Sequence, residues 1–328
     1  MQALSDTLRA GMAERIAIDH CPVCKATGRE HWLAAAGFEL VRCRACGHRY
    51  SSAVLSSEAL AHDYYDEPDA ALISRSMAAK TARFEEYLAL LGPAAARGRV
   101  LDVGCNSGEL LSLFQRQGWT PFGIEMSPGP ARHAEQLLGA RIWRGRVEDV
   151  LPPGLQFDLI TMSHVLEHIH QPADLIARLR QALSQGGRLL VEVPNADDRL
   201  LSLWGGGYRP LCPGDHLSFF DAAHLREILE MCGFAVRDLV SLTHARDLVY
   251  PSLLSSVDRV RSALRPRTGD ALPGVCGQTR YRGRFRRPLR WVLDGVVEAF
   301  DPAVVMLTRS WRTAQRGSVL VAVAEARP

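Results

Sequence analysis

Short apolar segments alternate with amphipathic ones from Gly98 onward, and this alternation constrains the fold more than any other feature. The apolar segments, such as residues 100–103 and 157–162, are nearly continuous in aliphatic and aromatic residues. Strands of this kind are buried on both faces of a sheet, whereas strands with one solvent-exposed face alternate polar and apolar residues. The chain therefore predicts a mainly parallel sheet that is covered by helices on both sides.

The order of these segments predicts an α/β, Rossmann-like fold with a seven-stranded mixed sheet, preceded by a small zinc ribbon and a helical lid. Glycines at 186–187 and 233 are expected to end helices. We expect strands at 100–103, 121–125, 141–143, 157–162, 188–193, 234–241 and 318–324, with helices at 107–117, 129–138, 172–184 and 221–232.

Four of the eight cysteines form two tight pairs near the start of the chain. Each pair has the spacing Cys-x2-Cys, and 18 residues separate the pairs, which is the spacing of a structural four-thiolate zinc site. A redox-active pair is the alternative, but no βαβ unit surrounds either pair. We predict that Cys21, Cys24, Cys43 and Cys46 bind Zn²⁺ and that the other four cysteines are free thiols.

We divide the chain into a zinc-ribbon module (1–57), a helical lid or linker (58–97) and a core (98–328) with an arginine-rich helical insertion at 246–316. The insertion holds 14 arginines and 6 acidic residues, whereas the whole chain has a net charge of only +3. Residues 288–312 mix apolar residues with arginines. They could complete a substrate pocket, form a dimer contact, lie on a membrane surface or dock an anionic substrate such as a pyrophosphate.

Composition also bears on which partners the protein binds and in which cellular compartment it works. Aromatic residues do not interleave with basic ones in the cysteine module, so nucleic-acid binding is not expected. No segment is long and apolar enough to span a bilayer or to serve as a signal core, so we expect a cytoplasmic protein. The expected binding partner is a small-molecule substrate. The expected oligomeric state is a monomer or a homodimer.

The run LDVGCNSGELL at residues 101–111 predicts a ligand site. Asp102 ends a strand, and Gly104 and Gly108 frame a turn into a helix, where backbone can approach a ligand closely. The spacing Gly-x-x-x-Gly differs from the Gly-x-Gly-x-x-Gly of dinucleotide sites, and the acid favours a cationic ligand. Downstream, Glu125 could accept both ribose hydroxyls and Asp149 an adenine amino group. The same surface is expected to include Cys105, Met126, Glu148, Ser163 and His164.

Residues 101–111 resemble motif I of class I S-adenosylmethionine (SAM)-dependent methyltransferases, and residues 157–169 resemble the segment after the fourth strand of that family. The resemblance covers about residues 98–242 and 317–326. It implies SAM as cofactor, with Asp102, Gly104 and Gly108 at its methionine end, Glu125 at its ribose and Asp149 at its adenine.

The chain also resembles a narrower group, the methyltransferases with an N-terminal zinc ribbon that act on nucleotide-linked deoxysugars. In the sugar C-methyltransferases of that group a Glu-His pair precedes Ser-Tyr-Phe, and the histidine is proposed as the base. Asp215-His216 precedes Leu-Ser-Phe-Phe here, and Tyr65 matches a tyrosine of the group. The resemblance implies His216, Asp215 and Tyr65 as catalytic residues. Aspartate replaces glutamate, and the insertion at 246–316 stands where the group has a further domain.

We therefore expect a SAM-dependent methyltransferase of a small molecule. The favoured acceptor is a nucleotide- or lipid-linked sugar of polysaccharide or natural-product biosynthesis. The first alternative is O-methylation of a quinone or phenolic lipid, and the second is a non-catalytic protein that uses the SAM fold for binding. For His216, the alternative to a base is a loop histidine that only caps or packs.

Overall fold

The computed structural model describes residues 15–56, 81, 83–92, 98–245, 247–249 and 300–327. Tyr65, most of the lid and residues 250–299 of the insertion lie outside these ranges, so their expected roles stay predictions. Within the described residues, no helix is long and apolar enough to cross a membrane.

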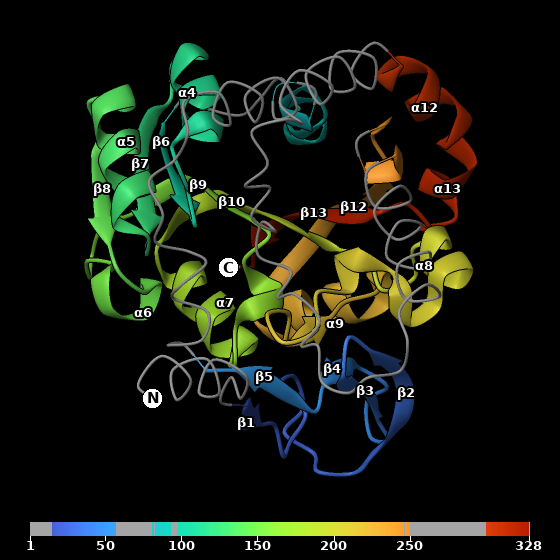
Figure 1. The fold of residues 1–328 in the computed structure, drawn as a ribbon. Helices are drawn as coiled ribbons and strands as arrows, with labels where there is room; N and C mark the ends of the chain where they lie inside the picture. Colours follow the sequence, from blue (N-terminus) through green and yellow to red (C-terminus); the bar gives the residue numbers. More distant parts are fainter. Residues whose placement is uncertain are drawn as a thin grey trace, which may run out of the picture.

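The expected seven-stranded mixed sheet is confirmed, with the strand order β12-β13-β10-β9-β6-β7-β8 (Figure 1). The five strands from β8 to β10 run parallel, while β13 pairs antiparallel with both β10 and β12. The strands are β6 (Arg99–Val103), β7 (Thr120–Glu125), β8 (Arg141–Arg144), β9 (Phe157–Ser163), β10 (Leu183–Pro194), β12 (Phe234–Leu242) and β13 (Val319–Ala326).

Helices cover both faces of this sheet because successive strand residues point to opposite sides. Leu159 and Leu190 pack with α4 and α5 and with a helix over residues 83–91, whereas Ile160 and Val191 pack with α7 and α9. The helices of the core are α4 (Glu109–Arg116), α5 (Pro128–Leu138), α6 (Val147–Val150), α7 (Pro172–Gln181), α8 (Arg199–Trp204), α9 (Ala222–Met231), α12 (Asp301–Leu307) and α13 (Arg309–Thr313), with short 3-10 turns η1 (Leu166–His168), η2 (Gly205–Gly207) and η3 (Arg209–Leu211).

Two local predictions were wrong. The helix expected to end at residue 184 ends at Gln181, because Leu183 already pairs with Phe157 as the first residue of β10. Gly186 and Gly187 therefore do not stop a helix; they lie in β10, where the register with β9 shifts. Cys212, expected to be a free thiol, is disulfide-bonded.

The N-terminal module is a small antiparallel sheet formed by β2 (Arg29–Ala35), β3 (Phe38–Cys43) and β4 (Arg49–Ser51). We call these strands, together with the cysteine turns before β2 and after β3, the ribbon. A separate pair joins β1 (Arg15–Ala17) to β5 (Ala53–Leu55). In Figure 1 the ribbon, in blue, lies beside α9 and away from α4 and α5. Its fourth strand, β11 (Ser218–Phe219), comes from the core.

Candidate active site

The turn from β6 to α4 has the geometry of a ligand cradle. Gly104, Asn106 and Gly108 all have positive φ angles (74°, 50° and 83°), a conformation that glycine and asparagine tolerate best. A Cβ at Gly104 would lie 2.5 Å from the Val165 side chain. The N–H groups of Gly104 and Cys105 both donate to the Ile124 carbonyl, at 2.8 and 3.0 Å, and this fixes the turn against β7.

Two carboxylates lie at the carboxyl ends of the neighbouring strands β6 and β7. Glu125 Oε2 accepts from the Asn106 N–H at 2.9 Å, and Oε1 accepts from the Ser127 N–H at 2.7 Å. Asp102 is buried, and its Oδ1 accepts from the Thr161 hydroxyl at 2.7 Å. Both carboxylates are oriented by the protein itself, and each oxygen has further lone pairs for a ligand.

The other residues expected at the cofactor surface differ in exposure. Met126, beside Glu125, has 55% of its surface exposed. Glu148 and Asp149 lie on α6, directly after β8, where Asp149 is exposed and Glu148 faces Arg146 at 3.6 Å. The Cys105 side chain is instead buried against Gly123, so its backbone is the part that can face a ligand.

Ser163 ends β9 and His164 follows it, and both side chains contact a buried carboxylate that the sequence did not single out. Glu192, on β10, accepts from the Ser163 hydroxyl at 3.1 Å, and its Oε1 lies 3.1 Å from His164 Nε2. His164 Nδ1 lies 3.2 Å from Glu167 Oε1. Partial desolvation opposes a charge on His164, whose side chain is 43% exposed, but the two carboxylates outweigh it and raise the pKa of the ring.

The helix at residues 83–91 completes this buried network. Arg83 Nη1 lies 2.8 Å from Glu192 Oε1, and the Tyr87 hydroxyl donates to Glu192 Oε2 at 2.7 Å. Burial alone would raise the pKa of Glu192, but the Arg83 and His164 cations hold it well below its ordinary value. The one sequence signal that could have predicted a role for Glu192 in the site was a glutamate inside a mostly apolar strand (RLLVEV).

Asp215 and His216 lie next to η1, where a carboxylate oxygen of Asp215 and a ring nitrogen of His216 are within 4.8 Å of each other, but Asp215 has a closer contact with another histidine. Asp215 Oδ1 lies 3.0 Å from His168 Nδ1. The His168 and His216 rings pack edge to face with centroids 4.8 Å apart, and the Nε2 of each lies 4.0 Å from Glu167 Oε1. His216 therefore belongs to a cluster with Glu167 and His168, and Asp215 orients His168.

Burial divides the protonation states of the two histidines. Desolvation, together with the neighbouring His168 cation, lowers the pKa of His216 to about 4. His168 is also desolvated, but the Asp215 and Glu167 carboxylates outweigh this and raise its pKa to about 9. At neutral pH His216 is therefore an uncharged proton acceptor, and His168 is a cation beside it.

Two buried atoms of this cluster, His216 Nδ1 and Glu167 Oε2, have no hydrogen-bond partner among the described residues. Buried polar atoms are normally paired, so their isolation indicates a place for a polar ligand group. One oxygen or nitrogen from each of Glu167, His168 and His216 lies within 4.8 Å of the other two, so the same cluster could hold a divalent cation. Cys212 is also near His216, but its sulfur is already in a disulfide.

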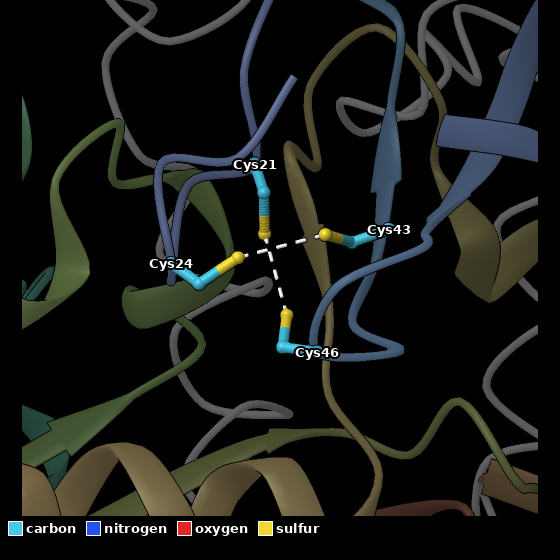
Figure 2. A group of neighbouring side chains, drawn as sticks. All are labelled: Cys21, Cys24, Cys43 and Cys46. Carbon is cyan, nitrogen blue, oxygen red and sulfur yellow. Dashed lines mark hydrogen bonds between the residues drawn. The ribbon is translucent and has the colours of Figure 1, made fainter. Parts of the chain in front are cut away.

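The four ribbon cysteines converge from two turns, as Figure 2 shows. The sulfurs of Cys21 and Cys46 lie 3.7 Å apart, and those of Cys24 and Cys43 lie 3.5 Å apart. A tetrahedral zinc site with Zn–S bonds of about 2.3 Å has S–S edges of about 3.8 Å. All four thiols are free of disulfides, so the donor set and the spacing both fit Zn²⁺.

The profile of the methyltransferase domain family matches residues 73–239, which include both halves of this site. The chain belongs to the methyltransferase domain family. The expected enzyme class, a SAM-dependent methyltransferase, is thereby confirmed.

Curated relatives of this methyltransferase agree in class. The ubiquinone biosynthesis O-methyltransferase of Pseudomonas putida is 26% identical over 216 residues, which are 61% of this chain and 90% of that protein. The protein of the same name from Aeromonas salmonicida is 30% identical over 159 residues, 45% of this chain and 67% of that one. Among solved structures, a SAM-dependent methyltransferase from Archaeoglobus fulgidus aligns with a TM-score of 0.46 and 17% identity, covering 76% of this chain and 94% of that one.

Proposed function

We propose that this methyltransferase methylates a small molecule that binds at the carboxyl ends of β9 and β10, with His216 as the general base. The observation that carries the proposal is the buried, unpartnered Nδ1 of an uncharged histidine beside an unpartnered carboxylate oxygen. A general base must be uncharged and must have a free lone pair for the proton, and His216 Nδ1 meets both conditions because it has no hydrogen-bond partner among the described residues.

We assign the cofactor half of the site to the cradle after β6. Glu125 is oriented to accept from the ribose hydroxyls of SAM, Asp102 and Gly104 to face its methionine end, and Asp149 to face its adenine. Gly104 must be glycine for the cradle to keep this shape, because its φ is positive and a Cβ would lie 2.5 Å from Val165. When bound, SAM supplies an electrophilic methyl group on a sulfonium. The chain contributes the alignment of the acceptor for in-line attack.

The acceptor half would work through the cluster around Glu167. His216 Nδ1 takes the proton from an acceptor hydroxyl, or from a carbon next to a carbonyl, and becomes charged. The Glu167 carboxylate, 4.0 Å from His216 Nε2, stabilises that charge. Asp215 keeps His168 oriented through Nδ1, so that the His168 ring supports His216 edge to face.

The favoured acceptor is a nucleotide- or lipid-linked sugar, because a ribbon precedes the SAM core and Asp215-His216 precedes an aromatic run. The second candidate is a quinone or phenolic lipid, which the names of the curated relatives favour.

We also propose that Cys21, Cys24, Cys43 and Cys46 bind one structural Zn²⁺, which closes the two turns and leaves no coordination position open for catalysis.

Transfer of a labelled methyl group from SAM tests this function. Nucleotide-linked deoxysugars and polyprenylated catechols are the two acceptor panels. We expect label on a sugar, and a decrease of about 10²–10⁴-fold in turnover for His216→Asn with unchanged SAM affinity. The exposed His170 offers a matched control, and His170→Asn should keep full turnover. Label on catechols would select the second candidate, and an unchanged rate in His216→Asn would exclude this histidine as the base.

A further inference from the structure

The ribbon and the proposed acceptor site share a β-sheet. Strand β11 begins two residues after His216 and pairs antiparallel with β4, so that Ser218 lies opposite Tyr50 and Phe219 opposite Arg49. The ribbon sheet is therefore completed by the loop that carries the proposed base, over residues 212–220. We call this segment the acceptor loop.

Backbone hydrogen bonds hold the acceptor loop from two sides. The Ser51 N–H donates to the Leu217 carbonyl at 2.9 Å, and the Leu217 N–H donates to the Glu167 carbonyl at 2.8 Å. A third bond runs from the Leu55 N–H to the Gly214 carbonyl at 2.8 Å. The loop thus lies between the ribbon side and η1, and His216 lies between its two points of attachment.

Side chains add contacts along the same boundary. Gly214 has a φ of 98°, and a Cβ there would lie 2.7 Å from the Phe38 ring of β3. The buried His48 ring packs against Phe220 with centroids 5.0 Å apart. His224 Nε2, on α9, donates to the Cys46 carbonyl at 2.9 Å. On the ribbon side, the acceptor loop therefore contacts β3, β4 and the turn that joins them after Cys43.

The turn that carries Cys43 and Cys46 joins β3 to β4, the two ribbon strands that make these contacts. Cys43 ends β3, and Cys46 and His48 form the turn into β4. A metal bound by four thiolates fixes both turns at once, and small zinc modules lose their fold without it. The cofactor half is built differently, because Asp102 and Glu125 bond to Thr161, Asn106 and Ser127 within the core.

We infer that metal bound by the four cysteines positions the acceptor loop, so that His216 is held in place only in the metal-loaded protein while the cofactor half forms without metal. The inference rests on the proposed zinc site and on the proposed role of His216. The ribbon is then a positioning element for the acceptor half of the active site, connected to it by β4 and by the contact of Phe38 with Gly214.

Amide hydrogen exchange of the full chain, with and without a zinc chelator, tests this inference. Removal of metal should speed exchange in peptides from residues 212–220 at least about tenfold, and re-addition of Zn²⁺ should restore protection. Peptides from residues 101–127 should not change, and the Kd for SAM should stay within about twofold. An unchanged acceptor loop would overturn the inference, and so would loss of protection at residues 101–127. A chain that binds no SAM in either state would refute the proposed function instead.

A variant that spares the thiols gives a second test. Gly214→Ala places a Cβ against Phe38 and should loosen the loop, whereas Gly154→Ala has a similar positive φ but open space around it. Coupling between two sites is reciprocal, so Gly214→Ala should also weaken zinc affinity by about the factor by which metal protects the loop. Equal zinc affinity in the native chain, Gly214→Ala and Gly154→Ala would contradict the coupling.

Discussion

Arg83 Nη1 lies 2.8 Å from Oε1 of the fully buried Glu192, and this pair joins the helix at residues 83–91 to the centre of the sheet. The other amino group of Arg83 lies 2.7 Å from Asp247 Oδ2. Glu192 also contacts His164 at the end of β9, so the pair connects the segment that enters the core to the proposed acceptor site.

Arg83→Met should therefore destabilise the protein strongly. Removing one partner of a buried ion pair costs up to about 3–5 kcal/mol in the free energy of unfolding, and here His164 and Tyr87 still contact Glu192 and offset part of that loss. The exposed pair of Arg237 with Glu325 provides the control, and Arg237→Met should cost no more than about 1 kcal/mol. Urea denaturation measures both values. Equal losses of unfolding free energy in the two variants would show that the buried pair stabilises the protein no more than the exposed pair does.

The order and type of the core strands could be predicted because each strand carries its own signal. Residues 101–111 combine an apolar strand with glycines whose positive φ angles the turn requires, and all of that information is local. The end of α7 could not be predicted in the same way. Leu183 continues the helical period of Leu175 and Leu179, but its pairing with Phe157 on β9 decides its conformation.

Contacts between segments that are distant in the sequence determine the structure of the acceptor half of the site. A single sequence does not reveal such contacts. Strand β11 has two residues, too few for a periodic signal, and its partner β4 lies far away in the chain. The neighbours Asp215 and His216 suggested a pair, yet η1 brings His168 to the Asp215 carboxylate instead. The cysteine spacing, in contrast, predicted a cluster that the structure brings together.

The pH dependence of turnover should be broad. His216 must be uncharged to accept a proton, and burial together with the His168 cation lowers its pKa to about 4. The kcat/KM measured with the accepted substrate should therefore fall as pH drops through about 4 and stay flat from about pH 5 through neutral pH. A single transition near the ordinary histidine pKa of about 6.5 would be incompatible with this assignment.

Stability should fall in the alkaline range. The pKa of His168 is raised in the folded protein, so its contribution is fully present below the unfolded pKa of about 6.5 and is lost as pH rises through about 9. The free energy of unfolding, measured by urea denaturation between pH 6 and pH 10, should decrease over that interval. His168→Gln should flatten the decrease, and an unchanged slope in this variant would argue against a protonated His168.

Metal content should be one zinc per chain at the ribbon. Replacing Cys21 and Cys43 by serine should remove it, whereas Cys232→Ser, at a half-buried free thiol outside the ribbon, should retain it. Elemental analysis of the purified proteins measures the difference. Any metal that remains in the double variant and is lost in His216→Asn would belong to the cluster with Glu167. Native metal content in the double variant would refute the four-thiolate site.

Calorimetric titration with SAM tests the central claim most directly. The native chain should bind one SAM. Glu125→Ala should weaken binding at least about tenfold, because charge-assisted hydrogen bonds to the ribose are each worth about 1.5–3 kcal/mol. Glu135→Ala, on the exposed side of α5, should bind as the native chain does. Absence of SAM binding by the native chain, or equal affinity in Glu125→Ala, would contradict the cofactor site described for this methyltransferase.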